Sequence, residues 1–448
     1  MPASVNERQI ALDLVMEIIE KGAYSNQILN QTLNKYAFLQ KEQRSLISRL
    51  TEGTIERRLT LDHCIMQYSR TDISKMEPEI RNILRIAVYQ IMYMDRIPDS
   101  AACDEAVKIT AKKGYPRLKG FVNGVLRNIA RGKEKLLSDL EKMGRPTSSV
   151  SSRSKAYSMP EWIVRSWDDM LGRKACTDVL RAYAGYEDGA GERRTCIRVN
   201  TLKTDPKEFA DKLKNNGVEA LADDEVSYIL YISGYDRITD LPGYAEGEFY
   251  VQDRSSMQVA IMADPKPKDT IIDVCAAPGG KSLHMAMLME GRGRIYARDI
   301  SEKKVGIIRE NIARCLPDAN GDCVIPQVYD ALEPDDTMTQ AADIVIADLP
   351  CSGLGVLAKK PDIRYRVTED DVTSLAALQA NMLDTVCGYV KEGGKLVFST
   401  CTITAAENHD NLTSFLSRHP DYELIEEDQI LPEAGVCDGF YISVLKRK

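Results

Sequence analysis

Two cysteines in the second half of the chain are the side chains best suited to covalent chemistry. Cys351 lies in ADLPCSGLG (347–355) and Cys401 in FSTCT (398–402), and each comes just after a predicted β-strand. Taken singly, either cysteine is more commonly a small buried apolar residue. The two strands are expected to be neighbours in one sheet, so both thiols fall at the same edge, where they indicate thiolate chemistry.

A turn of small residues precedes the cysteines at 270–281, with the sequence TIIDVCAAPGGK. Its β-branched residues predict a buried parallel strand, and its alanines and glycines would let a ligand approach the backbone closely. A helix starting near Lys281 would point its first N–H groups at that ligand. Gly280-Lys281-Ser282 matches the end of a Walker A loop, but Cys275 stands where that loop has its first glycine. A G-x-G-x-x-G fingerprint is absent, and an ordinary strand-to-helix connection is the remaining alternative.

Three aspartates at predicted strand ends favour one kind of cofactor. An acid about twenty residues beyond the glycine turn, Asp299, can accept hydrogen bonds from ribose hydroxyls, and Asp330, one strand further on, can meet an adenine amino group. A triphosphate would be repelled by these acids and by Asp348, and helped by Lys281 alone. S-adenosylmethionine has ribose and adenine without phosphate, so it fits better. For each aspartate alone, a loop or helix-cap role is the alternative.

Alternating strands and helices from residue 270 onward predict an α/β doubly wound, Rossmann-like domain with a parallel sheet at 261–448. The expected strands are 271–274, 294–299, 324–329, 344–347 and 395–399, with helices at 281–289 and 302–314. Ligands in such sheets bind beyond the carboxyl ends of the strands. The aspartates and both cysteines fall at those ends.

The chain before this domain predicts two others. Residues 1–140 read as an all-α domain, with apolar residues at helical spacing at 10–19 and 80–91. A run of serines at 144–155 predicts a linker. Residues 156–260 predict a small α/β module, in which a helix opens at Pro160, strands lie in 197–203 and 228–232, and a helix covers 206–215.

The charge is distributed unevenly along the chain. The net charge is −8, but residues 1–135 carry 22 Lys and Arg against 16 Asp and Glu, while the remainder carries 37 against 51. A basic cluster near the end of the all-α domain indicates a phosphate-binding surface, a solvated helix face being the alternative. The cluster consists of Lys108, Lys112, Lys113, Arg117, Lys119, Arg127, Arg131, Lys133 and Lys135.

The composition predicts a soluble, cytoplasmic protein. Hydrophobic residues make up 44% and charged residues 28% of the chain, without a signal peptide or a membrane-spanning run. The eleven cysteines include no C-x-x-C pair, which argues against a structural metal and against a disulfide framework. We therefore expect free thiols in a reducing compartment, no metal, no membrane contact and a monomer.

Motifs in the chain resemble two known families. GAYSN (22–26) and FVNGVLRNIAR (121–131) resemble the RNA-binding domain of the NusB antitermination family, which implies RNA contact by the all-α domain. DVCAAPGGK, ADLPCSG, KKPDIRYR and STCT, in this order, resemble the cytosine-5 RNA methyltransferases of the RsmB (Sun) family, with RVNTLK and VQDRSS between. The resemblance covers nearly the whole chain. It implies methyl transfer from S-adenosylmethionine to one cytosine of 16S ribosomal RNA.

The resemblance also implies a role for each matching residue. Cys401 would be the nucleophile that adds to C6 of cytosine, and Cys351 would assist product release. Asp348 would lie between cofactor and base, near N3, to hold or donate a proton there. Asp299 would hold the ribose and Asp330 the adenine. The stretch lining the cofactor would be Cys275, Ala276, Ala277, Pro278, Gly279, Gly280 and Lys281.

A thiol has an ordinary pKa of about 8.5, so Cys401 needs a positive field, for which Lys281 is our candidate. The stretch after Cys401, TITAAENHDNL, keeps Glu407-Asn408 but lacks the proline expected before them, and DGFYISVL varies the aromatic strand near the C-terminus. Related enzymes act on other ribosomal RNA sites or on transfer RNA, so the target cytosine stays open. A non-catalytic RNA-binding assembly factor and a P-loop NTPase are the alternative functions.

Overall fold

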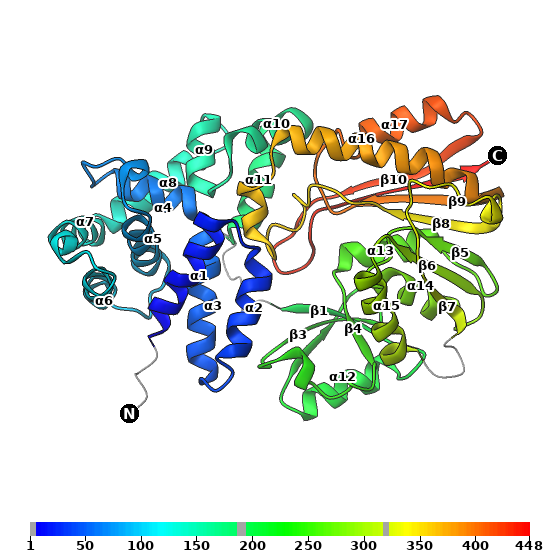
Figure 1. Ribbon diagram of the computed structural model, residues 1–448, viewed down its shortest axis with the longest axis horizontal. Coiled ribbons are helices and arrows are strands. Elements are labelled where there is room, and N and C mark those ends of the chain that lie inside the picture. The colour runs from blue at the N-terminus through cyan, green and yellow to red at the C-terminus, as the bar shows by residue number, and fades with distance from the viewer. Residues whose placement is uncertain (1–5, 186–193, 317–321) are drawn as a thin grey trace. The chain divides into compact units, whose positions relative to one another are not determined.

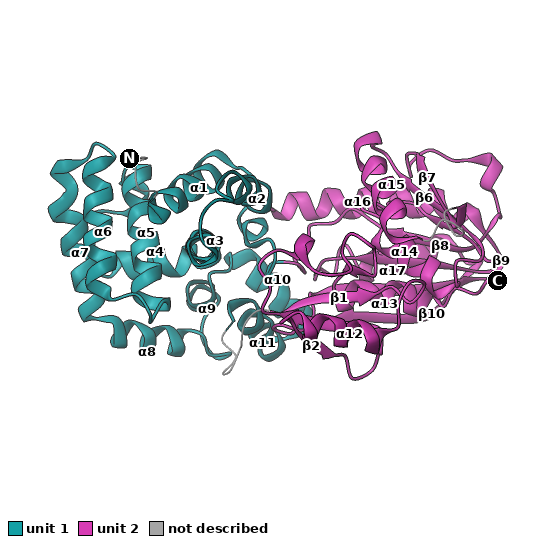
Figure 2. Cartoon of the chain, turned by 90° about the horizontal axis from the view of Figure 1, so that it is seen from below, with its two compact units in different colours: residues 1–186, 357–366 teal, residues 187–356, 367–448 magenta. Residues whose placement is uncertain are grey.

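The computed structural model describes residues 6–185, 194–316 and 322–448. Residues 1–5 of the predicted N-terminal domain and 186–193 of the predicted middle module lie outside the described residues. The chain forms two compact units (Figure 2). Unit 1 comprises Met1–Tyr186 together with Leu357–Arg366, and unit 2 comprises Glu187–Val356 together with Val367–Lys448.

Unit 1 is helical throughout its described residues, which confirms the predicted all-α N-terminal fold. Its central helix, α5, is buried along almost its whole length between α1, α3, α4, α6 and α7. The elements are α1 (Glu7–Lys21), α2 (Ser25–Lys35), α3 (Lys41–Glu56), α4 (Arg58–Met66), η1 (Ile73–Lys75), α5 (Pro78–Tyr93), α6 (Asp99–Lys112), η2 (Pro116–Leu118), α7 (Lys119–Arg131), α8 (Lys133–Met143), α9 (Val150–Tyr157), α10 (Glu161–Leu171) and α11 (Arg173–Ala184) (Figure 1).

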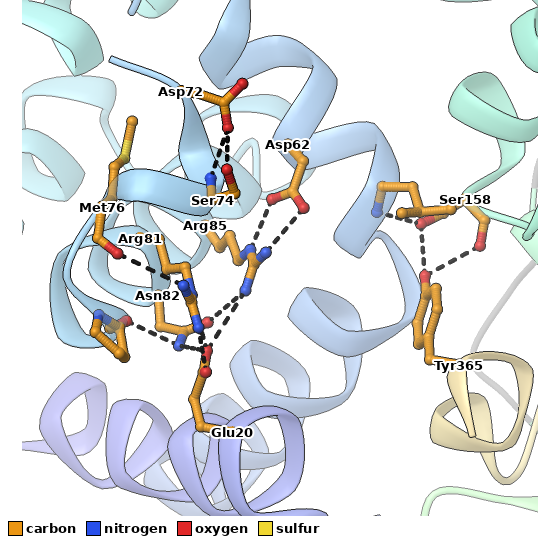
Figure 3. A network of polar contacts seen from close by, with 12 residues as sticks. Glu20, Asp62, Asp72, Ser74, Met76, Arg81, Asn82, Arg85, Ser158 and Tyr365 are labelled. Atoms are coloured by element: carbon orange, nitrogen blue, oxygen red, sulfur yellow. Dashed lines mark hydrogen bonds and ion pairs between the residues drawn. The ribbon is translucent and has the colours of Figure 1, made fainter.

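A network of polar side chains joins α1, α4 and α5 inside unit 1 (Figure 3). Arg85 of α5 donates to both carboxylate oxygens of Asp62 on α4, at 2.6 and 2.8 Å. Arg81 pairs with Glu20 of α1, and the fully buried Asn82 donates to the same carboxylate at 2.8 Å. These groups satisfy one another, so they can be buried without the penalty of an unpaired charge.

The predicted linker at 144–155 is wrong in its second half, because α9 begins at Val150. The Ser149 side chain caps this helix by accepting a hydrogen bond from the N–H of Ser152 at 3.1 Å. Arg153 is fully buried and pairs with Asp168 of α10. Serines favour loops and helix N-caps alike, so composition alone did not separate the two.

Unit 1 also contains a segment from much later in the chain, Leu357–Arg366, with the short helix η6 (Pro361–Tyr365). The side chain of Asp362 accepts hydrogen bonds from the backbone N–H and the hydroxyl of Ser25, the first residue of α2. The hydroxyl of Tyr365 lies 2.7 Å from that of Ser158 (Figure 3), and the Arg58 guanidinium lies 3.9 Å from the centre of the Tyr365 ring. The KKPDIRYR motif therefore contributes to the packing of unit 1.

Unit 2 contains a small antiparallel sheet with strand order β2-β3-β1-β4. The predicted helix at 206–215 is confirmed as α12. The strand predicted at 197–203 ends earlier, because the Asn200 side chain donates to the carbonyl oxygen of Gly247 at 2.9 Å and turns the chain. The elements are β1 (Thr195–Val199), α12 (Pro206–Asn215), β2 (Glu219–Ala222), β3 (Ile229–Ser233), η3 (Ile238–Asp240) and β4 (Phe249–Val251).

The larger sheet of unit 2 has the order β10-β11-β9-β8-β5-β6-β7. The Rossmann-like fold is confirmed, but the sheet is mixed, because a C-terminal hairpin adds two antiparallel strands beside the five parallel ones. The strands are β5 (Thr270–Asp273), β6 (Arg294–Asp299), β7 (Val324–Val328), β8 (Ala342–Asp348), β9 (Val390–Thr400), β10 (Tyr422–Ile430) and β11 (Phe440–Arg447).

Helices cover both faces of this sheet. One apolar core contains residues of α13, α14 and α15 with one set of strand residues, and the other contains residues of α16 and α17 with the opposite set (Figure 1). Alternate strand residues such as Ile271 and Ile272 enter the two cores separately. The elements are α13 (Arg254–Ala263), α14 (Gly280–Leu288), α15 (Glu302–Cys315), η5 (Asp336–Met338), α16 (Glu369–Val386), η7 (Cys387–Tyr389) and α17 (His409–Arg418).

Candidate active site

The carboxyl ends of the five parallel strands of unit 2 lie side by side in the order β9, β8, β5, β6, β7. The register pairs Asp348 of β8 with Ser399 of β9. All predicted site residues follow these ends, so they line one edge of the sheet. In order along that edge they are Cys401, then Asp348 and Cys351, then Cys275, Ala276, Ala277, Pro278, Gly279, Gly280 and Lys281, then Asp299 and finally Asp330.

The glycine turn lies between the end of β5 and the start of α14, as the sequence predicted. Gly279 has a φ of 103°, in a region that side chains with a Cβ rarely adopt, and it precedes the first residue of α14. A Cβ added to Gly280 would lie 2.9 Å from the Tyr250 ring. The N–H of Ala277 donates to the Asp299 carboxylate at 3.4 Å, which links the turn to the end of β6.

The ends of β6 and β7 carry the two acids predicted to hold ribose and adenine. Asp299 is 3% exposed and lies 3.2 Å from the Lys304 ammonium. Asp330 is half-buried and accepts a hydrogen bond from the N–H of Leu332 at 3.0 Å. Ile300, directly after Asp299, is 61% exposed. The sequence analysis missed this apolar side chain, although its position beside a strand-end acid suits contact with the face of a planar ring.

Asp348 lies between the glycine turn and the cysteines and is held from two sides. Lys281 donates to one of its oxygens at 2.7 Å, and the buried Ser399 hydroxyl, also missed from the sequence, donates to the other at 2.8 Å. Burial alone would lower the pKa of Lys281, but the negative charges of Asp348, Asp273 and Cys401 raise it, so the ammonium persists. Because Lys281 is paired with Asp348, it is poorly placed to serve a triphosphate, which argues against the P-loop hypothesis.

A further buried acid, Asp273, lies at the end of β5 behind the turn. It is fully buried and accepts a hydrogen bond from the Ser282 hydroxyl at 2.6 Å. Burial raises the pKa of Asp273 to about 7. No role for this acid was predicted from the sequence. At neutral pH the carboxyl is therefore only partly ionised.

The sulfur atoms of Cys351 and Cys401 lie 3.2 Å apart, and all eleven cysteines are free thiols. The pKa of Cys351 lies well above its ordinary value, first because of its hydrogen bond to Cys401, then because of burial, and then because of the negative charges of Cys401, Glu407 and Asp348. Two thiols this close share a proton between them. The charged form of Cys401 also raises the pKa of Lys281.

The backbone after Cys351 packs directly on Cys401. The N–H of Gly355 donates to the carbonyl oxygen of Cys401 at 3.0 Å, and the Gly355 carbonyl accepts from the N–H of Gly439 at 2.8 Å. A Cβ on Gly355 would lie 1.9 Å from the Gly439 carbonyl oxygen. Only glycine fits this position, so the two cysteine-bearing segments have a fixed separation.

The basic cluster of unit 1 is partly neutralised by its own surroundings. Lys113 pairs with Asp13 at 2.5 Å, and Lys112 donates to the side chain of Gln9 at 2.7 Å. Lys108 and Lys133 also pair with acids. Within the described residues, no ion pair engages Arg117, Lys119 or Lys135. Arg127 and Arg131 likewise form no ion pair among these residues but donate to the side chains of Asn123 and Asn128, so Arg117, Lys119 and Lys135 are the cations most available to an external phosphate.

In the part of the chain that the structure describes, no helix has the length and apolarity needed to cross a membrane. The same residues include no cluster of three or more His, Cys, Asp and Glu side chains that could hold a metal ion.

Family models and known proteins match this chain over much of its length. A family model described as 16S rRNA methyltransferase RsmB/F matches residues 260–446, and that of the NusB family matches residues 5–131. The chain is 33% identical to a probable ribosomal RNA small subunit methyltransferase B of Bacillus subtilis, over 98% of each chain. It is 29% identical to the ribosomal RNA small subunit methyltransferase B of Pectobacterium atrosepticum, over 99% of each.

Solved structures agree with the fold. The crystal structure of PH0851 superposes with a TM-score of 0.78 at 25% identity and covers 99% of both chains. The crystal structure of NSun6 from Pyrococcus horikoshii with SFG covers 64% of this chain and 98% of its own, with a TM-score of 0.55 at 21% identity. The first of these matches both units, and the second matches the fold of part of the chain.

Proposed function

This chain belongs to the RsmB/F family of S-adenosylmethionine-dependent 16S ribosomal RNA methyltransferases, and from that premise we propose that it forms 5-methylcytosine through a covalent bond between Cys401 and the base. The observation that carries the proposal is the pair of free thiols, 3.2 Å apart, at the ends of adjacent strands. A methyltransferase that used no covalent step would have no need of two thiols in contact at this place.

The cofactor fits the edge of the sheet that the glycine turn lines. The small residues from Cys275 to Gly280 would hold its methionine part, Asp299 its ribose, and Asp330 with Ile300 its adenine. This orientation turns the sulfonium end toward β8 and β9, where Asp348 and the cysteines follow the strands. When bound, S-adenosylmethionine supplies an electrophilic methyl group, which C5 of the activated cytosine takes.

Nucleophilic addition is the step that activates the base. C5 of cytosine is too electron-poor to attack a sulfonium methyl, so the Cys401 thiolate first forms a bond to C6. The electron pair of the C5–C6 double bond moves toward C5, which becomes enamine-like. Asp348, fixed by Lys281 and Ser399, would hydrogen-bond the N3 edge of the base and steady the adduct. The Lys281 ammonium lowers the cost of forming the thiolate.

Release reverses the addition. Water takes the C5 proton, the C5–H electron pair restores the C5–C6 double bond, and the C6–S bond breaks with its electron pair returning to Cys401. The Cys351 thiol would donate a hydrogen bond to the departing thiolate, as the contact between the two sulfur atoms allows. Cys351 therefore assists release without forming a bond to the base.

The substrate and setting follow from the family and the free thiols. We propose that the protein acts as a monomer in the cytoplasm without a metal, and that the NusB-like fold of unit 1 binds ribosomal RNA through Arg117, Lys119 and Lys135. Methylation of a single cytosine of 16S ribosomal RNA can be tested directly.

The test is to map 5-methylcytosine in 16S ribosomal RNA from cells with and without this protein. One cytosine should lose its methyl group when the protein is absent and regain it on expression of the wild type but not of Cys401→Ala. An unchanged methylation map would contradict the proposal, and a change confined to transfer RNA would redirect the assignment of substrate.

A further inference from the structure

Glu407, six residues after Cys401, is fully buried beside the cysteine pair. One carboxylate oxygen accepts the backbone N–H of Ser352 at 2.8 Å, and the other accepts the Ser352 hydroxyl at 2.5 Å. The Thr404 hydroxyl donates at 2.9 Å and the amide of Gln379 at 3.2 Å. All four donors are neutral groups.

This carboxylate ties together the segments that carry the two thiols. Ser352 directly follows Cys351, and Thr404 lies three residues past Cys401. The Ser352 hydroxyl also lies 2.7 Å from that of Thr402, which follows Cys401. Hydrogen bonds in a dry environment hold their geometry, so Glu407 fixes the position of one thiol relative to the other.

The charge of Glu407 is not neutralised by a basic residue. Among the described residues, no lysine or arginine forms an ion pair with it, although hydrogen bonds satisfy its oxygens. A buried unpaired charge acts strongly on its neighbours because little solvent screens it. Its negative charge contributes to the raised pKa of Cys351, while the positive Lys281 is coupled to Cys401. The negative Glu407 therefore acts on Cys351, and the positive Lys281 interacts with Cys401.

We propose that Glu407 is a positioning residue that sets the separation of the two thiols and keeps the negative charge of the pair on Cys401. This inference rests on the proposed function, in which Cys401 is the nucleophile. Glu407 touches neither substrate nor cofactor in that scheme, and it acts through the segment of Cys351. A purely structural role would predict a loss of stability with no change in which thiol is the more reactive.

The experiment measures the reactivity of each thiol in the full chain without RNA. Wild type and Glu407→Gln are treated with iodoacetamide at pH 7.5, and alkylation of Cys351 and Cys401 is followed separately by peptide mass spectrometry. Cys401 should react faster in the wild type. Glu407→Gln keeps the shape and removes the charge, so Cys351 should ionise more readily and the ratio of the two rates should fall by about threefold to tenfold.

Two further variants separate the effect of the Glu407 charge from the effect of Glu407 on the position of the Cys351 segment. Glu310→Gln, at an exposed position of α15, makes the same change and should leave the ratio at its wild-type value. Ser352→Ala removes the hydroxyl hydrogen bond that links the Cys351 segment to Glu407 but keeps the Glu407 charge. It should therefore keep the wild-type ratio of alkylation rates while lowering kcat, with unchanged affinity for S-adenosylmethionine. Because Ser352→Ala tests positioning without touching Glu407, it decides that part of the proposal even where Glu407→Gln does not fold.

The outcomes distinguish this inference from the proposed function. An unchanged ratio in Glu407→Gln, with Cys401 the faster thiol in the wild type, would overturn the charge-placing role alone. A wild-type kcat for Ser352→Ala would overturn the positioning role. Faster alkylation of Cys351 than of Cys401 in the wild type would instead contradict the choice of Cys401 as nucleophile.

Discussion

Ser399 donates a hydrogen bond to Asp348 at 2.8 Å, between residues that stand opposite each other at the ends of β9 and β8. Lys281 occupies the other carboxylate oxygen at 2.7 Å. The sheet register and the first turn of α14 thus hold the carboxylate in one orientation between the glycine turn and the cysteines. Such fixing of a group that meets the substrate lowers the entropy lost on reaching the transition state.

Removing the Ser399 hydroxyl should slow catalysis without affecting the cofactor. Loss of a hydrogen bond to a charged group costs about 1.5–3 kcal/mol, so Ser399→Ala should lower kcat/KM by about tenfold to a hundredfold. Initial rates of tritiated methyl transfer to unmodified ribosomal RNA measure this. Ser417→Ala on the exposed surface of α17 is the matched control, and equal rates for the two variants would remove Ser399 from the mechanism.

Asp299→Ala should weaken binding of S-adenosylmethionine. The side chain is buried at the end of β6 and would lose its hydrogen bonds to the ribose hydroxyls, at a cost of about 1.5–3 kcal/mol, or roughly ten- to a hundredfold in affinity. Isothermal titration calorimetry gives the affinity directly. Asp322→Ala, an exposed aspartate at the start of β7, should bind as tightly as the wild type. Unchanged affinity in Asp299→Ala would place the ribose elsewhere.

Reversing Lys112, Lys113 and Lys119 to glutamate should weaken RNA binding and flatten its dependence on salt, since fewer counterions are released. Lys119 should account for the largest share, because the other two already contact Asp13 and Gln9. RNA affinity measured from low to moderate salt gives the slope. Cofactor affinity should stay the same.

The control for the lysine variant reverses Lys266, Lys446 and Lys448 of unit 2, which changes the net charge equally. Lys266 precedes the amino end of β5, and Lys446 lies opposite Lys395 of β9, with Lys448 two residues further on. All three are away from the carboxyl ends of the parallel strands, where the site lies. A basic cluster that only solvates a helix face would give the same RNA affinity and salt slope in both variants as in the wild type.

Glu20 should make unit 1 sensitive to acid. Burial alone would raise its pKa, but hydrogen bonds from Arg81 and Asn82 and the charges of Arg81 and Arg85 lower it below the ordinary 4.5. The folded state therefore keeps the carboxylate where the unfolded chain takes up a proton. This contribution to stability is present above the ordinary pKa and is lost as the pH falls through the lower folded value.

Thermal melting followed by circular dichroism checks the sign of this effect. Glu20→Gln should have a lower melting temperature than the wild type at pH 7. The difference between the two melting temperatures should narrow as the pH falls from 5 to 3. The matched variant Glu141→Gln, at an exposed position of α8, should show a small gap at every pH. A gap for Glu20→Gln that widened in acid would contradict the lowered pKa.

Local sequence patterns predicted most of the parallel sheet. The bounds of β6 at 294–299 and of α12 at 206–215 were predicted to the residue, because Ile295 and Tyr296 favour a strand and a proline at the first position favours a helix start. The C-terminal strand in DGFYISVL was expected and is β11, but β10 and the antiparallel pairing were missed, because pairing with β9 depends on contacts about fifty residues away. The linker prediction failed where Arg153 is buried against Asp168, a partner that composition does not show.

The site residues also differ in whether the sequence alone could predict them. Motif residues such as Asp348 and Cys401 could be placed from the sequence because each directly follows a strand. Ser399 and Glu407 acquire their importance only from what they contact across the sheet or between loops, and Ile300 from its exposure beside Asp299. The packing of the segment 357–366 into unit 1 likewise depends on contacts such as that of Asp362 with Ser25, 337 residues away along the chain.

In the proposed mechanism Cys401 forms the bond to cytosine, and Cys351 acts only after methyl transfer. Cys351→Ala should therefore add Cys401 to the base and transfer the methyl group, but remain attached to the RNA because the departing thiolate lacks its hydrogen-bond donor. Cys401→Ala should form no adduct, and neither should the double variant.

A denaturing gel of each variant, incubated with substrate RNA and S-adenosylmethionine, tests this most directly. We expect a slow, denaturation-resistant protein–RNA band for Cys351→Ala and none for Cys401→Ala or the double variant. A resistant band with Cys401→Ala and none with Cys351→Ala would contradict it and make Cys351 the nucleophile.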